Sequence, residues 1–188
     1  MASLRVPVNE KDHAQGPEDA NVTLVEYGDY ECPSCGQAYP IVKRIRQQFE
    51  DRLRFVFRNF PLSEIHPEAL PAAIVAEFAG TRGKFWEAHD ALFENQNVLG
   101  TRFYSRLLLT LDLPPEEFAR EVRDNTLESR VRSDFRGGVR SGVNGTPTFF
   151  INGHRYDGPF TFDALARAIE VEIERPKNQG IEQPGGKK

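Results

Sequence analysis

The two cysteines of this 188-residue chain lie three positions apart, in the run Cys32-Pro33-Ser34-Cys35. An apolar segment, residues 22–27, precedes them, and a segment with helical periodicity follows. This order predicts a strand, a short loop and a helix that begins at the cysteines. Residues i and i+3 on one helical turn lie about 5–6 Å apart, which is a Cα separation that a disulfide accepts. The pair can therefore close to a disulfide and reopen with little backbone movement.

The position of Cys32 at the predicted helix start favours its thiolate. Free backbone N–H groups and the helix dipole stabilise an anion there, which lowers the pKa of a thiol. Cys32 is thus the expected nucleophile, and Cys35, one turn deeper, is the expected resolving thiol of a mixed disulfide. Pro33 suits the first helical turn because it has no N–H and a fixed φ.

Three other roles are known for closely spaced cysteines. A structural zinc site needs about four ligands, yet there is no third cysteine, and the histidines (His13, His66, His89 and His154) lack ligand spacing. A c-type haem site would need a histidine where Gly36 stands. A structural disulfide stays open, although so short a loop gives little entropic stabilisation. We favour a redox-active dithiol, and we expect no metal and no cofactor.

Composition narrows the class of protein. With 39% hydrophobic and 11% aromatic residues, the chain can form one domain of ordinary size, or one domain with an insertion. A net charge of −4 indicates neither nucleic acid nor an anionic membrane surface as a partner. No apolar run approaches the roughly 20 residues of a membrane span, and the first residues lack a signal-peptide core. We expect a cytoplasmic monomer, the alternative being a periplasmic or extracytoplasmic mature form.

The first third of the chain predicts a β-α-β unit. Residues 22–27 and 52–60 have strand patterns, and a helix with Pro40 inside it lies between them, so the two strands should be parallel. A short edge strand is expected earlier, at residues 5–8. Glu26 interrupts the first strand. Its carboxyl either points to solvent or, if buried, accepts the proton of Cys35.

Residues 62–141 change to helical patterns, and the last segments return to strand. Five helices are expected, near residues 68–78, 85–93, 103–111, 114–125 and 127–139. Gly137-Gly138 should end or break the fifth. Residues 143–151 and 154–157 then predict a hairpin through a type I′ turn at Asn152-Gly153. A final helix, residues 162–173, precedes a polar tail.

This outline resembles the thioredoxin superfamily: β-α-β, a helical insertion, a β-hairpin and a helix, with Cys-x-x-Cys at the first strand–helix junction and Thr-Pro before the hairpin. The helical insertion is similar to that of its DsbA-like branch. The resemblance implies an α/β thioredoxin-like fold. The implied divisions are an N-terminal extension (1–20), a thioredoxin-like domain in two parts (21–61 and 142–174), an inserted helical domain (62–141) and a flexible tail (175–188).

The resemblance also implies roles for single residues. Cys32 and Cys35 match the nucleophilic and resolving cysteines, and Glu26 matches the buried acid of the family. Pro147 matches the family's cis-proline, and Thr146 before it would offer its backbone to an extended substrate. The substrate-binding residues implied in this way are Thr146, Pro147, Pro33 and Ser34.

The residues around the dithiol depart from the strongly oxidising relatives. Those relatives carry Pro-His between the cysteines, where this chain has Pro33-Ser34. Asp29 and Glu31 add negative charge, which should raise the pKa of the nearby thiol. We therefore hypothesise a milder oxidant than the periplasmic type.

The sequence thus predicts a thiol-disulfide oxidoreductase that acts on protein or peptide thiols and disulfides. Its redox partner would be thioredoxin, glutathione or a membrane oxidase. One alternative is a peptide-binding or chaperone-like module whose dithiol is a redox sensor. The other is a glutathione-linked isomerase or transferase of small molecules from the DsbA-like branch. Relatives of that kind usually carry serine at the position of Cys32 and lack Cys35.

Overall fold

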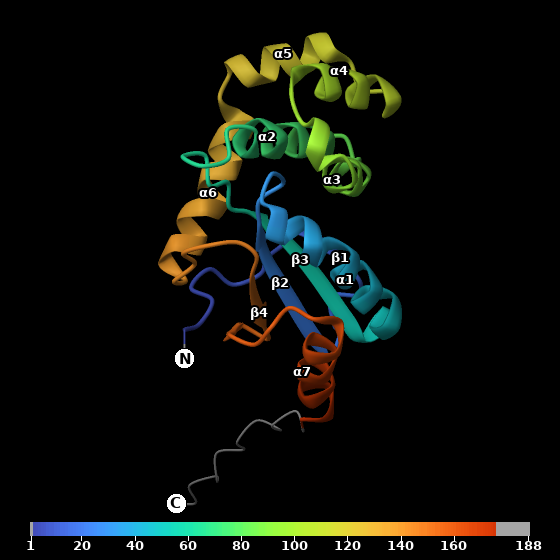
Figure 1. The fold of residues 1–188 in the computed structure, drawn as a ribbon, viewed down its shortest axis with the longest axis vertical. Coiled ribbons are helices and arrows are strands. Elements are labelled where there is room, and N and C mark those ends of the chain that lie inside the picture. The colour runs from blue at the N-terminus through green and yellow to red at the C-terminus, as the bar shows by residue number, and fades with distance from the viewer. Residues whose placement is uncertain (1, 176–188) are drawn as a thin grey trace, which may run out of the picture.

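A five-stranded mixed sheet lies at the centre of the computed structural model, which describes residues 2–175 (Figure 1). Its strands are β1 (His13–Gln15), β2 (Val22–Gly28), β3 (Leu53–Asn59), β4 (Thr148–Ile151) and β5 (His154–Tyr156). They follow the order β1-β3-β2-β4-β5, in which β2 and β3 are parallel and the other neighbours are antiparallel. This arrangement confirms the predicted β-α-β unit and hairpin. The hairpin turn has positive φ at both Asn152 and Gly153, as a type I′ turn requires.

Each face of the sheet has its own apolar core. On one face, α1 (Pro33–Phe49) and α7 (Phe162–Glu174) pack against side chains such as Leu24 and Phe149. On the other face, Val25 and Phe150 contact the N-terminal segment and α6 (Thr126–Arg140). Because successive strand residues point to opposite faces, neighbouring residues of β2 serve both cores.

The helical insertion lies beyond one end of the sheet, and α6 returns from it alongside the strands (Figure 1). Besides α6, it contains α2 (Ala69–Gly80), α3 (Phe85–Glu94), α4 (Thr101–Thr110) and α5 (Pro115–Arg123). The five helices confirm the expected insertion and, with it, the thioredoxin-like α/β fold. The tail expected from 175 onward lies, apart from Arg175, outside the described residues.

The expected edge strand at residues 5–8 was wrong. The edge strand is β1, which pairs with β3. The carbonyls of Val6 and Pro7 instead accept hydrogen bonds from the guanidinium of Arg58, at 2.8 Å and 3.1 Å. These carbonyls bond a side chain, so they do not contribute to a strand ladder.

The expected helix break at Gly137-Gly138 was also wrong, because α6 continues to Arg140. A Cβ atom at Gly138 would lie 2.6 Å from Phe60 Cδ2 and 3.0 Å from Tyr27 Cδ1. The glycine therefore allows α6 to approach the sheet closely rather than ending the helix.

Gly138→Ala should destabilise the protein, because overpacking a core usually costs about 1–3 kcal/mol. The gain in helix propensity of about 1 kcal/mol offsets part of this cost, so a net loss of up to about 2 kcal/mol is expected. Urea unfolding measures the difference. Gly145→Ala is the matched control, since a Cβ there meets no described atom within 4 Å. Equal stabilities of the two variants would contradict the close packing of α6.

Candidate active site

The two cysteines lie where β2 passes into α1. Cys32 is the N-cap of α1 with extended backbone, Pro33 begins the helix, and Cys35 lies in its first turn. Both are free thiols; Cys32 is 7% exposed and Cys35 is fully buried. Cys32 is therefore the more exposed residue of the pair.

The pKa of Cys32 is lowered to about 5. The largest cause is the hydrogen bond from the Cys35 thiol; burial opposes it, and Thr146 and the backbone N–H groups of Cys35 and Ser34 add further stabilisation of the thiolate. The pKa of Cys35 is raised well above its ordinary value, chiefly by burial. At neutral pH the pair therefore holds one thiolate, on Cys32, and one thiol.

The lowered pKa of Cys32 agrees with its place at the helix start, and the carboxylates of Asp29 and Glu31, which the sequence predicts to raise it, are not among the main causes of the shift. Both are bound by groups of the helical insertion. Asp29 accepts hydrogen bonds from the backbone N–H of Leu62 at 3.0 Å and from Nδ1 of His66 at 2.7 Å. Glu31 accepts one from the backbone N–H of Glu68. The hydrogen-bond donors around the start of α1 lower the pKa of Cys32.

Thr146, which precedes Pro147, lies against Cys32. The peptide bond between them is cis, as the resemblance implied. The Cys32 thiol donates a hydrogen bond to the Thr146 carbonyl, with 3.4 Å between Sγ and the oxygen. The Thr146 hydroxyl is buried and has no hydrogen-bond partner among residues 2–175. It can therefore turn to the sulfur when Cys32 becomes a thiolate and needs a donor.

Glu26 is buried in the central strand β2, with 3% of its surface exposed, so the alternative of a solvent-facing carboxyl is excluded. Its Oε1 has no hydrogen-bond partner in the described part of the chain. Burial, with a smaller contribution from the charge of Cys32, raises the pKa of Glu26 to about 8. Its own charge in turn helps to raise the pKa of Cys35. A carboxyl in this state can exchange a proton with the buried thiol.

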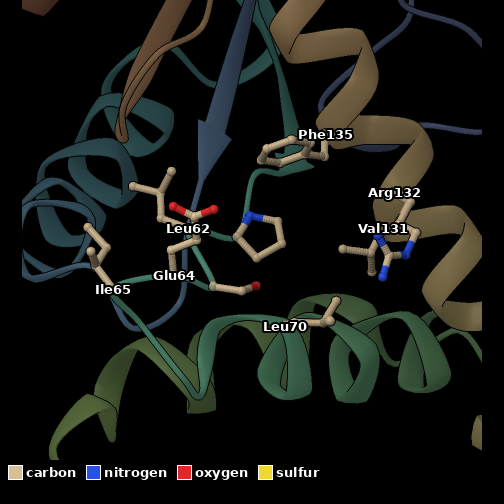
Figure 2. Close-up of a pocket in the computed structure, with 9 residues that line it drawn as sticks. Leu62, Glu64, Ile65, Leu70, Val131, Arg132 and Phe135 are labelled. Atoms are coloured by element: carbon tan, nitrogen blue, oxygen red, sulfur yellow. The ribbon is translucent and has the colours of Figure 1, made fainter.

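An apolar pocket of about 510 Å³ opens beside this site, between the loop after β3, the start of α2 and α6 (Figure 2). Leu62 and Ile65 lie toward one side of it in Figure 2, and Val131 and Arg132 of α6 toward the other. Ile65 is 69% exposed. Leu62 lines the pocket and also donates a hydrogen bond from its backbone N–H to Asp29. The pocket therefore adjoins the loop that leads to the dithiol.

Two further findings concern the described residues only. Within residues 2–175, no three His, Cys, Asp or Glu side chains are grouped so that they could hold a metal ion. The same residues include no helix with the length and apolarity needed to cross a membrane.

The fold and the Cys-x-x-Cys pair define a thioredoxin-like protein with a helical insertion. The chain belongs to the thioredoxin family, whose sequence pattern it matches over residues 8–171. It is similar in structure to oxidised BdbD of Bacillus subtilis, with a TM-score of 0.76, 26% identity, and coverage of 86% of this chain and 92% of that one. The DsbA-like fold is also that of alpha-DsbA1 of Wolbachia pipientis, with a TM-score of 0.78, 18% identity, and coverage of 90% and 94%.

Curated relatives are longer proteins. The Na(+)/H(+) antiporter NhaA 1 of Salinispora arenicola is 40% identical over 198 residues, which cover 98% of this chain and 30% of that protein. The antiporter NhaA 3 of Salinispora tropica is 42% identical over 170 residues, covering 90% and 26%. The chain therefore spans less than a third of the length of these two relatives.

Thr146→Val should raise the pKa of Cys32 by about one unit, since a hydrogen bond to a charged group contributes about 1.5 kcal/mol and one unit corresponds to about 1.4 kcal/mol. The ultraviolet absorbance of the thiolate, followed against pH, measures it. Thr148→Val is the control, because that hydroxyl bonds the Gly145 carbonyl instead. An unchanged pKa in Thr146→Val would show that the hydroxyl does not face the thiolate.

Glu26→Gln should slow the attack of Cys35 on a mixed disulfide by on the order of 100-fold, because it removes a general base. The rate is measured as the release of glutathione from a mixed disulfide prepared on Cys32. A wild-type rate would exclude Glu26 as the proton acceptor.

The same variant should change the pH dependence of folding. The unfolded carboxyl ionises near its ordinary pKa of 4.5, whereas folded Glu26 keeps its proton to about pH 8. Wild-type stability therefore falls as the pH rises between these values. From about pH 4 to about pH 7 the stability of Glu26→Gln should rise by about 3 kcal/mol relative to wild type. Parallel pH curves in urea unfolding would contradict a neutral, buried Glu26.

Proposed function

We propose that the chain is a thiol-disulfide oxidoreductase that exchanges disulfides with protein or peptide substrates through Cys32 and Cys35. The observation that carries this proposal is the asymmetry of the pair. The pKa of Cys32 lies near 5, whereas that of the buried Cys35 lies well above its ordinary value. One sulfur is thus a ready nucleophile, and the other is kept protonated until a second step requires it.

The exchange proceeds through two displacements. The Cys32 thiolate attacks a substrate disulfide, forms a mixed disulfide and expels one substrate thiolate. Cys35 then attacks the Cys32 sulfur, which forms the Cys32–Cys35 disulfide and expels the second substrate thiolate. The substrate gains two electrons and the dithiol loses two. The steps run in reverse when the protein starts oxidised and the substrate reduced.

Glu26 is suited to the second displacement. The Cys32 thiolate contributes to the raised pKa of Glu26, and this charge disappears once Cys32 is part of a mixed disulfide. The carboxyl therefore ionises more readily at the stage when Cys35 must lose its proton. It accepts that proton directly or through a water molecule.

The backbone at Thr146-Pro147 supports an extended substrate. Its Thr146 carbonyl lies 3.4 Å from the sulfur of Cys32, so a chain joined to that sulfur passes along this segment and pairs with it like a strand. Pro33 and Ser34 border the same sulfur from α1. The apolar pocket beside Leu62 would receive a hydrophobic side chain of the substrate.

The alternatives fit the site less well. A redox sensor needs neither a buried proton acceptor such as Glu26 nor a cis-proline facing its thiols. The relatives that act on small molecules usually lack the second cysteine, which is retained here as Cys35. The antiporter names belong to relatives that are more than three times longer. The cellular compartment and the redox partner stay predictions. So does the hypothesis that the protein is a milder oxidant than the periplasmic type.

Cys35→Ala should trap mixed disulfides on Cys32, because the resolving attack is lost, whereas Cys32→Ala should trap none. Each variant is incubated with an oxidised protein substrate, quenched with alkylating reagent and analysed by mass spectrometry. The double variant is the control for background modification. Equal trapping by the two single variants would overturn the assignment of roles.

A further inference from the structure

The helical insertion holds the loop that carries the nucleophile, residues 29–32. The carboxylates of Asp29 and Glu31 bond groups of the insertion, as described above. The hydroxyl of Tyr30 lies 3.1 Å from Nδ1 of His89 on α3. Each of these contacts involves a side chain of the loop. The loop backbone is held by Gln96.

Gln96 opens η2, the short helix Gln96–Val98 that joins α3 to α4. Its Nε2 donates to the carbonyl of Tyr30 at 2.7 Å and to the carbonyl of Cys32 at 3.0 Å. An amide NH2 group has two hydrogens, so both are used on the backbone next to the nucleophile. The Cys32 carbonyl also accepts the first hydrogen bond of α1, from the N–H of Gly36 at 3.1 Å.

Gly36 makes room for this amide. A Cβ atom at position 36 would lie 2.0 Å from Oε1 of Gln96 and 2.8 Å from its Cδ. The side chain of Gln96 therefore lies directly on the first turn of α1, where any residue larger than glycine would displace it.

We propose that Gln96 is a positioning residue for disulfide exchange, which fixes the backbone of Cys32 from the insertion so that the donors of α1 face its sulfur. The inference rests on the proposed function, and it adds a structural link between the helical insertion and Cys32. A movement of η2 when a substrate contacts the insertion would reach the Cys32 carbonyl through one side chain. The insertion thereby adjusts the reactivity of the thiolate as well as shaping the surface around it.

Gln96→Ala should raise the pKa of Cys32 by about 0.5–1 unit, in proportion to a hydrogen bond of about 1 kcal/mol. The equilibrium with glutathione should shift by about 3- to 10-fold toward the Cys32–Cys35 disulfide, because the reduced form loses thiolate stabilisation. Asn97→Ala is the matched control: Asn97 is an exposed amide in the same η2 helix, and its removal should change neither value.

Gly36→Ala provides a second variant that leaves Gln96 in the chain. Its methyl group should push the amide away and raise the pKa of Cys32 by a similar amount. In the Gln96→Ala background that space is empty, so Gly36→Ala should then have little further effect. The pKa of Cys32 in the double variant should equal that in either single variant and should not show the sum of the two shifts. The melting temperature of the double variant should not fall below that of Gln96→Ala.

A wild-type pKa and glutathione equilibrium in folded Gln96→Ala would overturn the inference, even if that variant melted at a lower temperature. If Gln96→Ala does not fold, the pKa of Cys32 and the glutathione equilibrium of Gly36→Ala provide the test instead. Both are measured without a protein substrate. A failure of the proposed function, seen as no trapping by Cys35→Ala, is thus distinguishable from a failure of this inference.

Discussion

A thiolate at Cys32 is stabilised by hydrogen-bond donors that come from two distant parts of the chain. The first turn of α1 supplies the Cys35 thiol and two backbone N–H groups, and Thr146 is supplied from 114 residues further on. Because the contributions that lower its pKa are hydrogen bonds, this thiolate depends on the direction of the donors. The site therefore requires that the start of α1 and the segment before β4 be held at a fixed separation.

The order of the strands meets this requirement. β2 lies in the sheet between β3 and β4, so its last residues lead into the dithiol while the segment before β4 lies beside them. The same central position buries Glu26 on the strand that ends at the nucleophile. The fold thus places a stabilised thiolate, a protonated thiol and a neutral carboxyl in one small region, in which Cys32 is the most exposed of the three residues.

Local patterns in the sequence were sufficient for much of this account. The apolar run before Cys32, the periodicity of the five inserted helices and the Asn152-Gly153 turn each depend on neighbours within a few residues, and each was predicted correctly. The resemblance to a known family supplied Pro147, and it favoured the buried alternative for Glu26 that the strand pattern alone left open.

The remaining features depend on contacts between distant residues, which no short pattern contains. The pair Gly137-Gly138 predicts a helix stop when only its neighbours in sequence are considered. The residue that Gly138 packs against, Phe60, lies 78 positions earlier. The bond between Asp29 and His66 spans 37 positions, and that from Gln96 to Cys32 spans 64. These contacts determine where the charges of the loop lie and how Cys32 is held. The direction of the pKa shift of Cys32 was predicted from its place at the helix start, but the identity of the groups that donate to its sulfur required the structure.

Catalytic turnover tests the central claim most directly. Insulin is mixed with dithiothreitol and a small amount of the protein, and the number of insulin disulfides reduced per protein molecule is counted against the uncatalysed reaction. Many turnovers per molecule are expected for the wild-type protein, and none for Cys32→Ala. At most one disulfide reduced per molecule would contradict an oxidoreductase and would instead indicate a dithiol that senses the redox state by reacting once.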